Sequence, residues 1–128
     1  MTQYKEFNFP LSSDRELVLT SAPGAFMPTG TTKLLIEAVQ QKVVEPVSLL
    51  DLGCGTGVVG LALHLYGLVK SPLYASDLSE PGVNCSKINL KRYECVSDVR
   101  NGSLFEPWLD HKFDVIVDLK QDKHIVSD

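Results

Sequence analysis

The sequence contains no long apolar run. The longest one extends from Val58 to Val69, is interrupted by His64, and is too short to cross a bilayer. The N-terminal residues 1–6 are polar and lack the apolar segment of a secretory signal. These absences argue against a membrane-spanning helix and a secretory leader, and we therefore expect a cytoplasmic protein.

Cysteine is also scarce. The three cysteines, Cys54, Cys85 and Cys95, are an odd number and form no C-x-x-C pair. Neither a disulfide framework nor a zinc site is expected from this pattern, and no metal is predicted. Reduced thiols agree with a cytoplasmic protein.

An excess of basic charge is missing as well. There are 12 lysines and arginines against 16 acidic residues, so the formal net charge is −4. This balance gives no strong electrostatic signal for nucleic acid or for a membrane surface. With 128 residues, 44% of them hydrophobic and 22% charged, the chain has the size and composition of one globular domain.

Apolar segments alternate between strand-like and helix-like patterns along most of the chain. We predict strands at residues 47–52, 72–77, 95–100 and 113–118, and helices from Thr31 or Thr32 to residue 42 and at residues 58–66 and 79–92. Residues 1–29 are predicted to be irregular or weakly extended, because Pro10, Pro23, Gly24 and Pro28 interrupt them. Residues 119–128 are predicted to be a short polar tail. This alternation predicts an α/β fold with a parallel sheet, which binds ligands at the carboxyl ends of its strands.

The most informative segment is the run from Leu49 to Gly60, LLDLGCGTGVVG, where a strand leads through a glycine turn into a helix. Glycines Gly53, Gly55 and Gly57 allow bare backbone to approach a ligand, and the helix start offers unpaired N–H groups. We therefore expect a loop that holds a nucleoside-bearing cofactor, with a purely structural turn as the alternative. The same residues with Gly60 also fit G-x-G-x-x-G, so a nicotinamide-dinucleotide oxidoreductase is a second alternative.

Two aspartates flank this glycine loop. Asp51 lies two residues before Gly53, where it would repel a pyrophosphate but could anchor an amine-bearing ligand or brace the loop. Asp77 lies 20 residues after Gly57, at the end of the next strand, an offset at which an acid can accept both ribose hydroxyls. The alternative role of Asp77 is to cap the following helix, which Ser79 could do instead.

These residues carry a resemblance to a known family. Residues 50–57, LDLGCGTG, resemble the first motif of class I S-adenosylmethionine-dependent methyltransferases, and residues 74–79 are similar to their next motif, whose acid binds the ribose. Residues 102–105 resemble the family's G-D-L-F, in which the acid near the adenine is replaced here by Ser103. Residues 25–32 resemble the segment that closes over the cofactor in the small-substrate group, which includes release-factor methyltransferases.

The resemblance implies a Rossmann-like sheet, S-adenosyl-L-methionine as cofactor, and methyl transfer to an unidentified acceptor, a small molecule or a protein. In the family Cys54 would fill the loop and would not act as a nucleophile. The implied cofactor-binding residues are Asp51, Gly53, Cys54, Gly55, Gly57, Asp77, Leu78, Ser103, Leu104, Phe26 and Thr29.

The chain departs from the release-factor group after the fourth predicted strand. That group carries an N-P-P-[YF] tetrad there, which holds a planar nitrogen, whereas this chain has DLKQ at residues 118–121. Transfer by such a tetrad is therefore not expected. Asp118 is the one candidate catalytic residue, and an exposed strand-end acid is its alternative role.

The four predicted strands are fewer than the roughly seven of the family, which would leave sheet edges unpaired. We therefore expect an incomplete, about four-stranded version of the fold, with an N-terminal extension at residues 1–29 and the cofactor-binding domain at residues 30–128. A truncated, non-catalytic cofactor-binding module is an alternative function. If the chain is complete, a homodimer or a partner subunit would supply the missing contacts.

Overall fold

The computed structural model describes residues 3–103, 105–119 and 123–126. The elements follow one another as β1 (Lys5–Ser12), β2 (Arg15–Ser21), α1 (Gly30–Lys42), β3 (Leu49–Leu52), α2 (Val58–Leu65), β4 (Leu73–Asp77), α3 (Glu80–Arg92), β5 (Ser97–Asn101), the short 3-10 helix η1 (Glu106–Trp108), β6 (Val115–Asp118) and β7 (Lys123–Val126).

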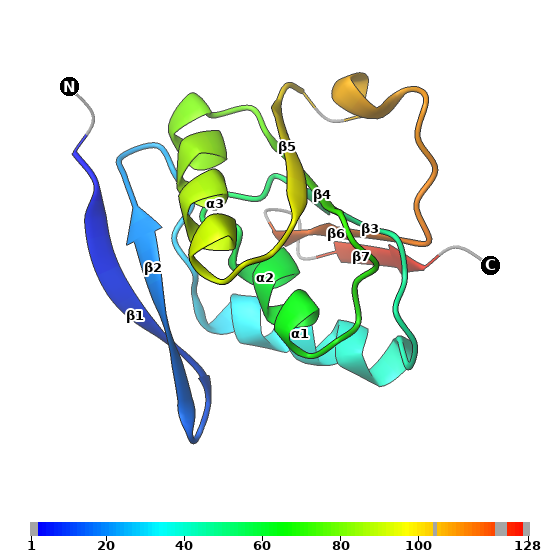
Figure 1. Cartoon of the computed structure of the whole chain (residues 1–128), viewed down its shortest axis with the longest axis horizontal. Coiled ribbons are helices and arrows are strands. Elements are labelled where there is room, and N and C mark those ends of the chain that lie inside the picture. Colours follow the sequence, from blue (N-terminus) through cyan, green and yellow to red (C-terminus); the bar gives the residue numbers. More distant parts are fainter. Residues whose placement is uncertain (1–2, 104, 120–122, 127–128) are drawn as a thin grey trace.

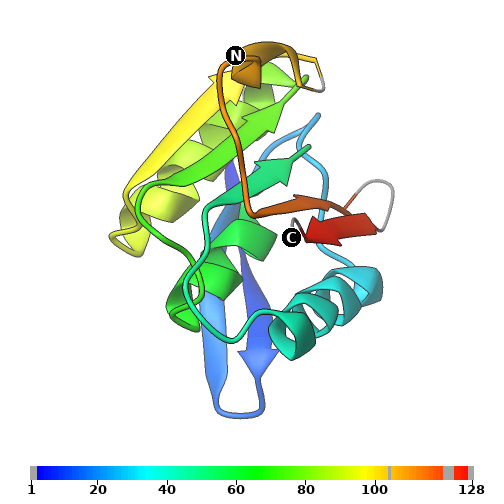
Figure 2. The same ribbon diagram turned by 90° about the vertical axis from the view of Figure 1, so that its right-hand side faces the viewer.

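The main sheet has the strand order β5-β4-β3-β6-β7 (Figures 1 and 2). Strands β5, β4, β3 and β6 are parallel, so the predicted four-stranded parallel sheet is confirmed. The predicted polar tail is wrong, because β7 pairs antiparallel with β6 as a fifth strand. Its apolar pair Ile125-Val126 is too short to show a period in the sequence, and the open edge of β6 provides the pairing.

The two faces of the sheet bury different sets of side chains. Leu49 and Leu73 point into the main core with the apolar faces of the helices. Leu50 and Leu52 of β3 lie on the opposite face and pack with Trp108 of η1. This alternation is the period-2 pattern of a strand that is buried on both faces, and it explains the continuous apolar runs.

Of the two alternatives for residues 1–29, irregular or weakly extended, the extended one is confirmed for β1 and β2. Strands β1 and β2 form an antiparallel hairpin, and α3 lies between this hairpin and the sheet (Figure 1). Pro10 suggested a break, yet an edge strand tolerates proline because one side of it needs no partner. Phe9, Leu17 and Leu19 are buried in the main core, so the hairpin is stabilised by tertiary packing.

The helix starts follow local capping chemistry. Helix α1 begins at Gly30 after Thr29, not after Thr31 or Thr32 as predicted, and the Thr29 N–H donates to Thr32 Oγ1 over 2.9 Å. This contact is the reciprocal half of a capping box, which the sequence analysis did not consider. Ser79 caps α3, as expected.

In the described part of the chain, no helix has the length and apolar character needed to cross a membrane. The division into an extension at residues 1–29 and a domain at residues 30–128 stays a prediction.

Candidate functional site

The carboxyl ends of the parallel strands meet at one edge of the sheet. At this edge Leu52 of β3 is in register with Ser76 of β4 on one side and with Asp118 of β6 on the other. Asp77 of β4 is in register with Asn101 of β5. The residues that follow these strands are therefore neighbours, as the parallel topology predicts.

The glycine loop joins β3 to α2 in a conformation that requires glycine. Gly55 and Gly57 have φ angles of 56° and 82°, in the left-handed region. A Cβ at Gly55 would lie 2.9 Å from the Phe26 carbonyl oxygen, and one at Gly57 would lie 3.2 Å from Ser86 Oγ. The absence of a Cβ therefore allows Gly55 to lie close to the segment before α1, and Gly57 to lie close to α3.

Asp77 connects the loop to the neighbouring strand. Its Oδ2 accepts from the Gly55 N–H over 2.7 Å, its Oδ1 accepts from the Ser79 N–H over 2.8 Å, and the residue is 2% exposed. These two backbone N–H groups fix the carboxylate of Asp77 beside the glycine loop. The bond to Ser79 is a local turn contact, while the helix cap itself is Ser79 Oγ, which accepts from the Gly82 N–H.

Asp51 is buried beneath the same loop. Its Oδ2 accepts from the Gly60 N–H over 3.2 Å, whereas Oδ1 has no hydrogen-bond partner among the described residues. Burial, with a smaller contribution from the carboxylates of Asp77 and Asp118, raises the pKa of Asp51 to about 7, although the Gly60 N–H opposes this shift. Near neutral pH this acid is therefore poised between its neutral and charged forms, and a cationic donor would favour the charged form.

Cys54 is held inside the loop. Its N–H donates to the Ser76 carbonyl over 2.9 Å, and Ser86 Oγ lies 3.0 Å from its Sγ. Burial raises the pKa of the Cys54 thiol well above its usual value, which keeps the sulfur protonated and unreactive. These contacts agree with Cys54 as a filler of the loop.

Four further predicted cofactor residues that the structure describes lie before α1 or after β4 and β5. Phe26 contacts the loop through its backbone and has a partly exposed ring, and Leu78 is 70% exposed directly after β4. Thr29 is the N-cap of α1, and Ser103 follows β5 and is half-buried. Leu104 lies outside the described residues.

Asp118 ends β6 next to the loop. Its backbone pairs with that of Leu52, the residue after Asp51, and its charge contributes to the raised pKa of Asp51. Lys120 and Gln121, which follow it, lie outside the described residues. The catalytic role of Asp118 stays a prediction.

The sequence analysis missed three side chains that hold this region together. Asn101 Nδ2 donates to the carbonyls of Asp77 and Leu78, over 3.0 and 3.1 Å, and fixes the turn after β4. Ser86 and Asn89 on α3 bond to carbonyls of the glycine loop. The spacing of Ser86 and Asn89, three positions apart on one helix, was the sequence pattern that could have indicated a shared buried face.

Comparison with known families gives a match along most of the chain. A model of the methyltransferase small domain matches residues 16–118. The ribosomal protein L11 methyltransferase of Lactobacillus johnsonii is 33% identical over 112 residues, and that of Staphylococcus aureus strain JH1 is 30% identical over 110 residues. The alignments cover 84% and 82% of this chain, and the chain spans about a third (34%) of the length of either relative.

Solved structures have the same fold. The 16S rRNA N2 G1207 methyltransferase of T. thermophilus, described in complex with AdoMet and guanosine, superposes with a TM-score of 0.77 at 22% identity, over 90% of this chain and 32% of that one. The ribosomal protein L11 methylase of Lactobacillus delbrueckii subsp. bulgaricus gives 0.70 at 25% identity, over 87% and 65%. The Rossmann-like fold predicted from the sequence is thereby confirmed.

Proposed function

The chain belongs to the methyltransferase small domain family, and on this premise we propose that it binds S-adenosyl-L-methionine at the glycine loop and supports transfer of the methyl group to an acceptor. The observation that carries the proposal is the hydrogen bond from the Gly55 N–H to Asp77 within the matched segment. It brings a carboxylate to the position where a ribose would meet the loop. The family assignment favours methyl transfer over the nicotinamide alternative.

The residues present fit the chemical groups of this cofactor. Asp77 places a carboxylate, the acceptor that ribose hydroxyls require, beside the glycine loop. The buried Oδ1 of Asp51 lacks a partner among the described residues, and its carboxylate suits the positively charged methionine end. The apolar side chains of Phe26 and Leu78 are partly or largely exposed beside the loop, as an adenine would require.

The cofactor supplies a methyl group on a positively charged sulfur, which makes that group electrophilic. The contribution of the protein is then to hold the nucleophile in line and to exclude competing groups, and such positioning can account for much of the catalysis. Asp118, at the end of β6 next to the loop, is the residue we propose to bind or deprotonate the acceptor.

We propose a protein acceptor associated with the ribosome. The relatives at 30% identity or more are named for ribosomal protein L11, whereas the rRNA methyltransferase, at 22% identity, supports only the fold. A ribosomal acceptor would assign the reaction to the cytoplasm.

A methyl-transfer experiment tests this proposal. The chain is incubated with S-adenosylmethionine that carries a labelled methyl group, and with ribosomal proteins and ribosomal RNA in separate reactions. We expect label in the protein fraction, and the Asp77→Ala variant should transfer none. Label in RNA alone would overturn the protein acceptor. Binding of the cofactor without any transfer would support the non-catalytic module.

A further inference from the structure

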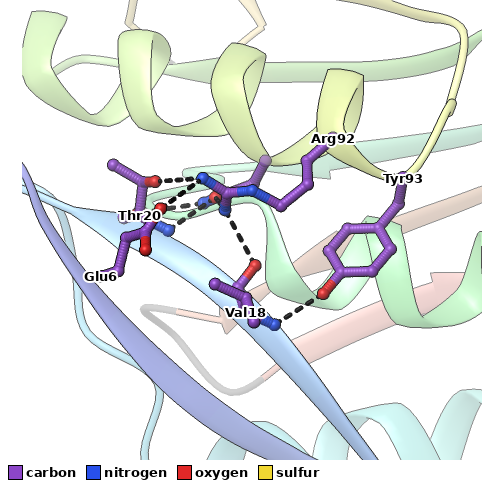
Figure 3. A network of polar contacts seen from close by, with 6 residues as sticks. Glu6, Val18, Thr20, Arg92 and Tyr93 are labelled. Carbon is purple, nitrogen blue, oxygen red and sulfur yellow. Dashed lines mark hydrogen bonds and ion pairs between the residues drawn. The ribbon is translucent and has the colours of Figure 1, made fainter.

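Helix α3 carries a row of three polar residues, Ser86, Asn89 and Arg92, spaced three positions apart. Residues at this spacing lie on one face of a helix. The row faces the glycine loop at one end and the β1–β2 hairpin at the other, and Figure 3 shows the hairpin end. Ser86 and Asn89 are fully buried, so their polar groups require partners.

Asn89 contacts both the loop and the hairpin. Its Nδ2 donates to the Thr56 carbonyl over 2.7 Å and to the Thr20 carbonyl over 3.0 Å. Its Oδ1 accepts from the Thr20 N–H over 2.6 Å and from Arg92 Nη1 over 3.1 Å. The single amide group therefore fixes the distance between the glycine loop and strand β2.

Ser86 acts on the adjacent peptide of the loop. Its Oγ donates to the Gly55 carbonyl over 2.7 Å, so the carbonyls of Gly55 and Thr56 are both held toward α3. The C=O and N–H of a trans peptide point in opposite directions. The N–H groups of Thr56 and Gly57 therefore point away from α3, and that of Gly57 closes the turn on the Cys54 carbonyl over 2.8 Å.

Arg92 and Tyr93 complete the attachment of the hairpin without reaching the loop. Arg92 Nη1 donates to the Val18 carbonyl, its Nη2 donates to Thr20 Oγ1 and pairs with Glu6, and the Val18 N–H donates to the hydroxyl of Tyr93 (Figure 3). The row thus has one end that contacts the loop, and another end, Arg92, that contacts the hairpin and Asn89.

The geometry points to Asn89, with Ser86, as positioning residues that set the peptide orientation of the cofactor loop and lock it to the β1–β2 hairpin. This inference rests on the proposed function, in which the loop binds the cofactor. Neither side chain touches the cofactor in this account. Arg92 is the matched control, because it belongs to the same row and donates to the hairpin and to Asn89 Oδ1 but forms no bond with the glycine loop.

The first test compares Asn89→Asp with Arg92→Met in binding S-adenosylhomocysteine by titration calorimetry. Asn89→Asp keeps the acceptor and loses both donated bonds, so we expect the Kd to rise at least about tenfold. Arg92→Met keeps the apolar stem, and its Kd should stay within about twofold even though the protein melts at a lower temperature. An equal loss of affinity in both variants would overturn the inference.

Ser86→Ala provides a milder variant in case Asn89→Asp does not fold. It removes one bond to the loop, and we expect the Kd to rise about threefold to tenfold. Unchanged affinity in Ser86→Ala and in any folded Asn89 variant would overturn the inference.

The second test does not depend on the ligand. Amide hydrogen exchange of Gly55 and Gly57 is measured relative to that of Leu50 in β3. We expect these two amides to exchange at least about tenfold faster in Asn89→Asp and in Ser86→Ala, and at the wild-type rate in Arg92→Met. If the wild-type chain binds no S-adenosylhomocysteine, the proposed function fails. The exchange rates then still decide the positioning role, and unchanged rates in all variants would overturn it.

Discussion

The Gly55 N–H donates a hydrogen bond to Oδ2 of Asp77 over 2.7 Å. This bond joins the turn after β3 to the end of β4, two segments that are 22 residues apart in the sequence. It is buried, so it stabilises the loop and also fixes the place of the one carboxylate that the proposed ribose contact needs. Loop geometry and cofactor affinity are therefore coupled through this pair.

Replacement of Asp77 by alanine should affect both properties. It leaves the buried N–H of Gly55 without its acceptor, which is expected to cost about 1–3 kcal/mol of the free energy of unfolding. It should also lower the affinity for S-adenosylhomocysteine at least about tenfold, because the ribose loses its acceptor. Chemical denaturation and titration calorimetry measure the two effects.

Asp98→Ala is the control for this substitution. Asp98 lies on the neighbouring strand β5 and forms a partly exposed ion pair with Arg100 at 2.9 Å. Such a pair contributes at most about 1 kcal/mol, and the affinity should not change. Wild-type affinity in Asp77→Ala would show that the ribose assignment is wrong.

Substitution of two glycines by alanine can distinguish the cost of backbone strain from the cost of steric overlap. Gly57 and Gly67 both have positive φ angles, 82° and 76°. A Cβ at Gly57 would meet Ser86 at 3.2–3.3 Å, whereas one at Gly67 would meet nothing within 4 Å. We expect Gly67→Ala to cost about 1 kcal/mol from strain alone. Gly57→Ala should cost roughly 1 kcal/mol more. Equal losses in denaturant titrations would show that α3 does not constrain the loop at Gly57.

Burial of Asp51 predicts a specific dependence of stability on pH. The pKa of Asp51 is raised from 3.8 to about 7 in the folded chain, so the folded state binds a proton that the unfolded state has lost between these values. The stability contributed by the neutral acid is therefore full below pH 3.8, falls as the pH rises to about 7, and is constant above that. The total change is on the order of 4 kcal/mol.

Asp51→Asn isolates this contribution. The amide can still accept from the Gly60 N–H but carries no charge. At pH 8 the variant should be more stable than the wild type by a few kcal/mol, and the difference should disappear near pH 4. Denaturant titrations give the free energy of unfolding of both proteins across this pH range. The difference between the two values at each pH removes the contribution of the other titrating groups. A pH-independent difference would contradict the raised pKa.

The same acid predicts a pH-dependent affinity. If Asp51 serves the positively charged end of the cofactor, binding must remove its proton below the pKa of about 7. The affinity for S-adenosylhomocysteine should therefore increase with pH up to about 7 and level off above. Asp51→Asn should bind weakly at every pH. If the affinity depends on pH in the same way in both proteins, Asp51 does not contact the cofactor and only stabilises the loop.

The sequence predicted which residues the fold brings together at the candidate site, because these residues follow the parallel strands. The ends of β3 and β4 were marked by apolar runs followed by Asp51 and Asp77, and a parallel sheet brings such ends together. The glycines at 55 and 57 were also recognised. Their close contacts with Phe26 and Ser86 were not, because tertiary contacts leave no local pattern.

The elements that were missed are those defined by pairing. The β1–β2 hairpin contains Pro10, which suggested a break, and β7 is only four residues long. Their backbones become strands through pairing with an edge that the sequence alone does not reveal. The role of Asn89 was not predicted either, because its partners Thr20 and Thr56 lie 69 and 33 residues away in the sequence.

The measurement that tests the central claim most directly is the melting temperature of the chain with S-adenosylhomocysteine, with S-adenosylmethionine, and with nicotinamide dinucleotides. A ligand that binds only the folded state raises the melting temperature. We predict that the two methionine-derived compounds stabilise the wild-type chain, that the dinucleotides do not, and that Asp77→Ala loses the effect. Stabilisation by a dinucleotide alone would contradict the account.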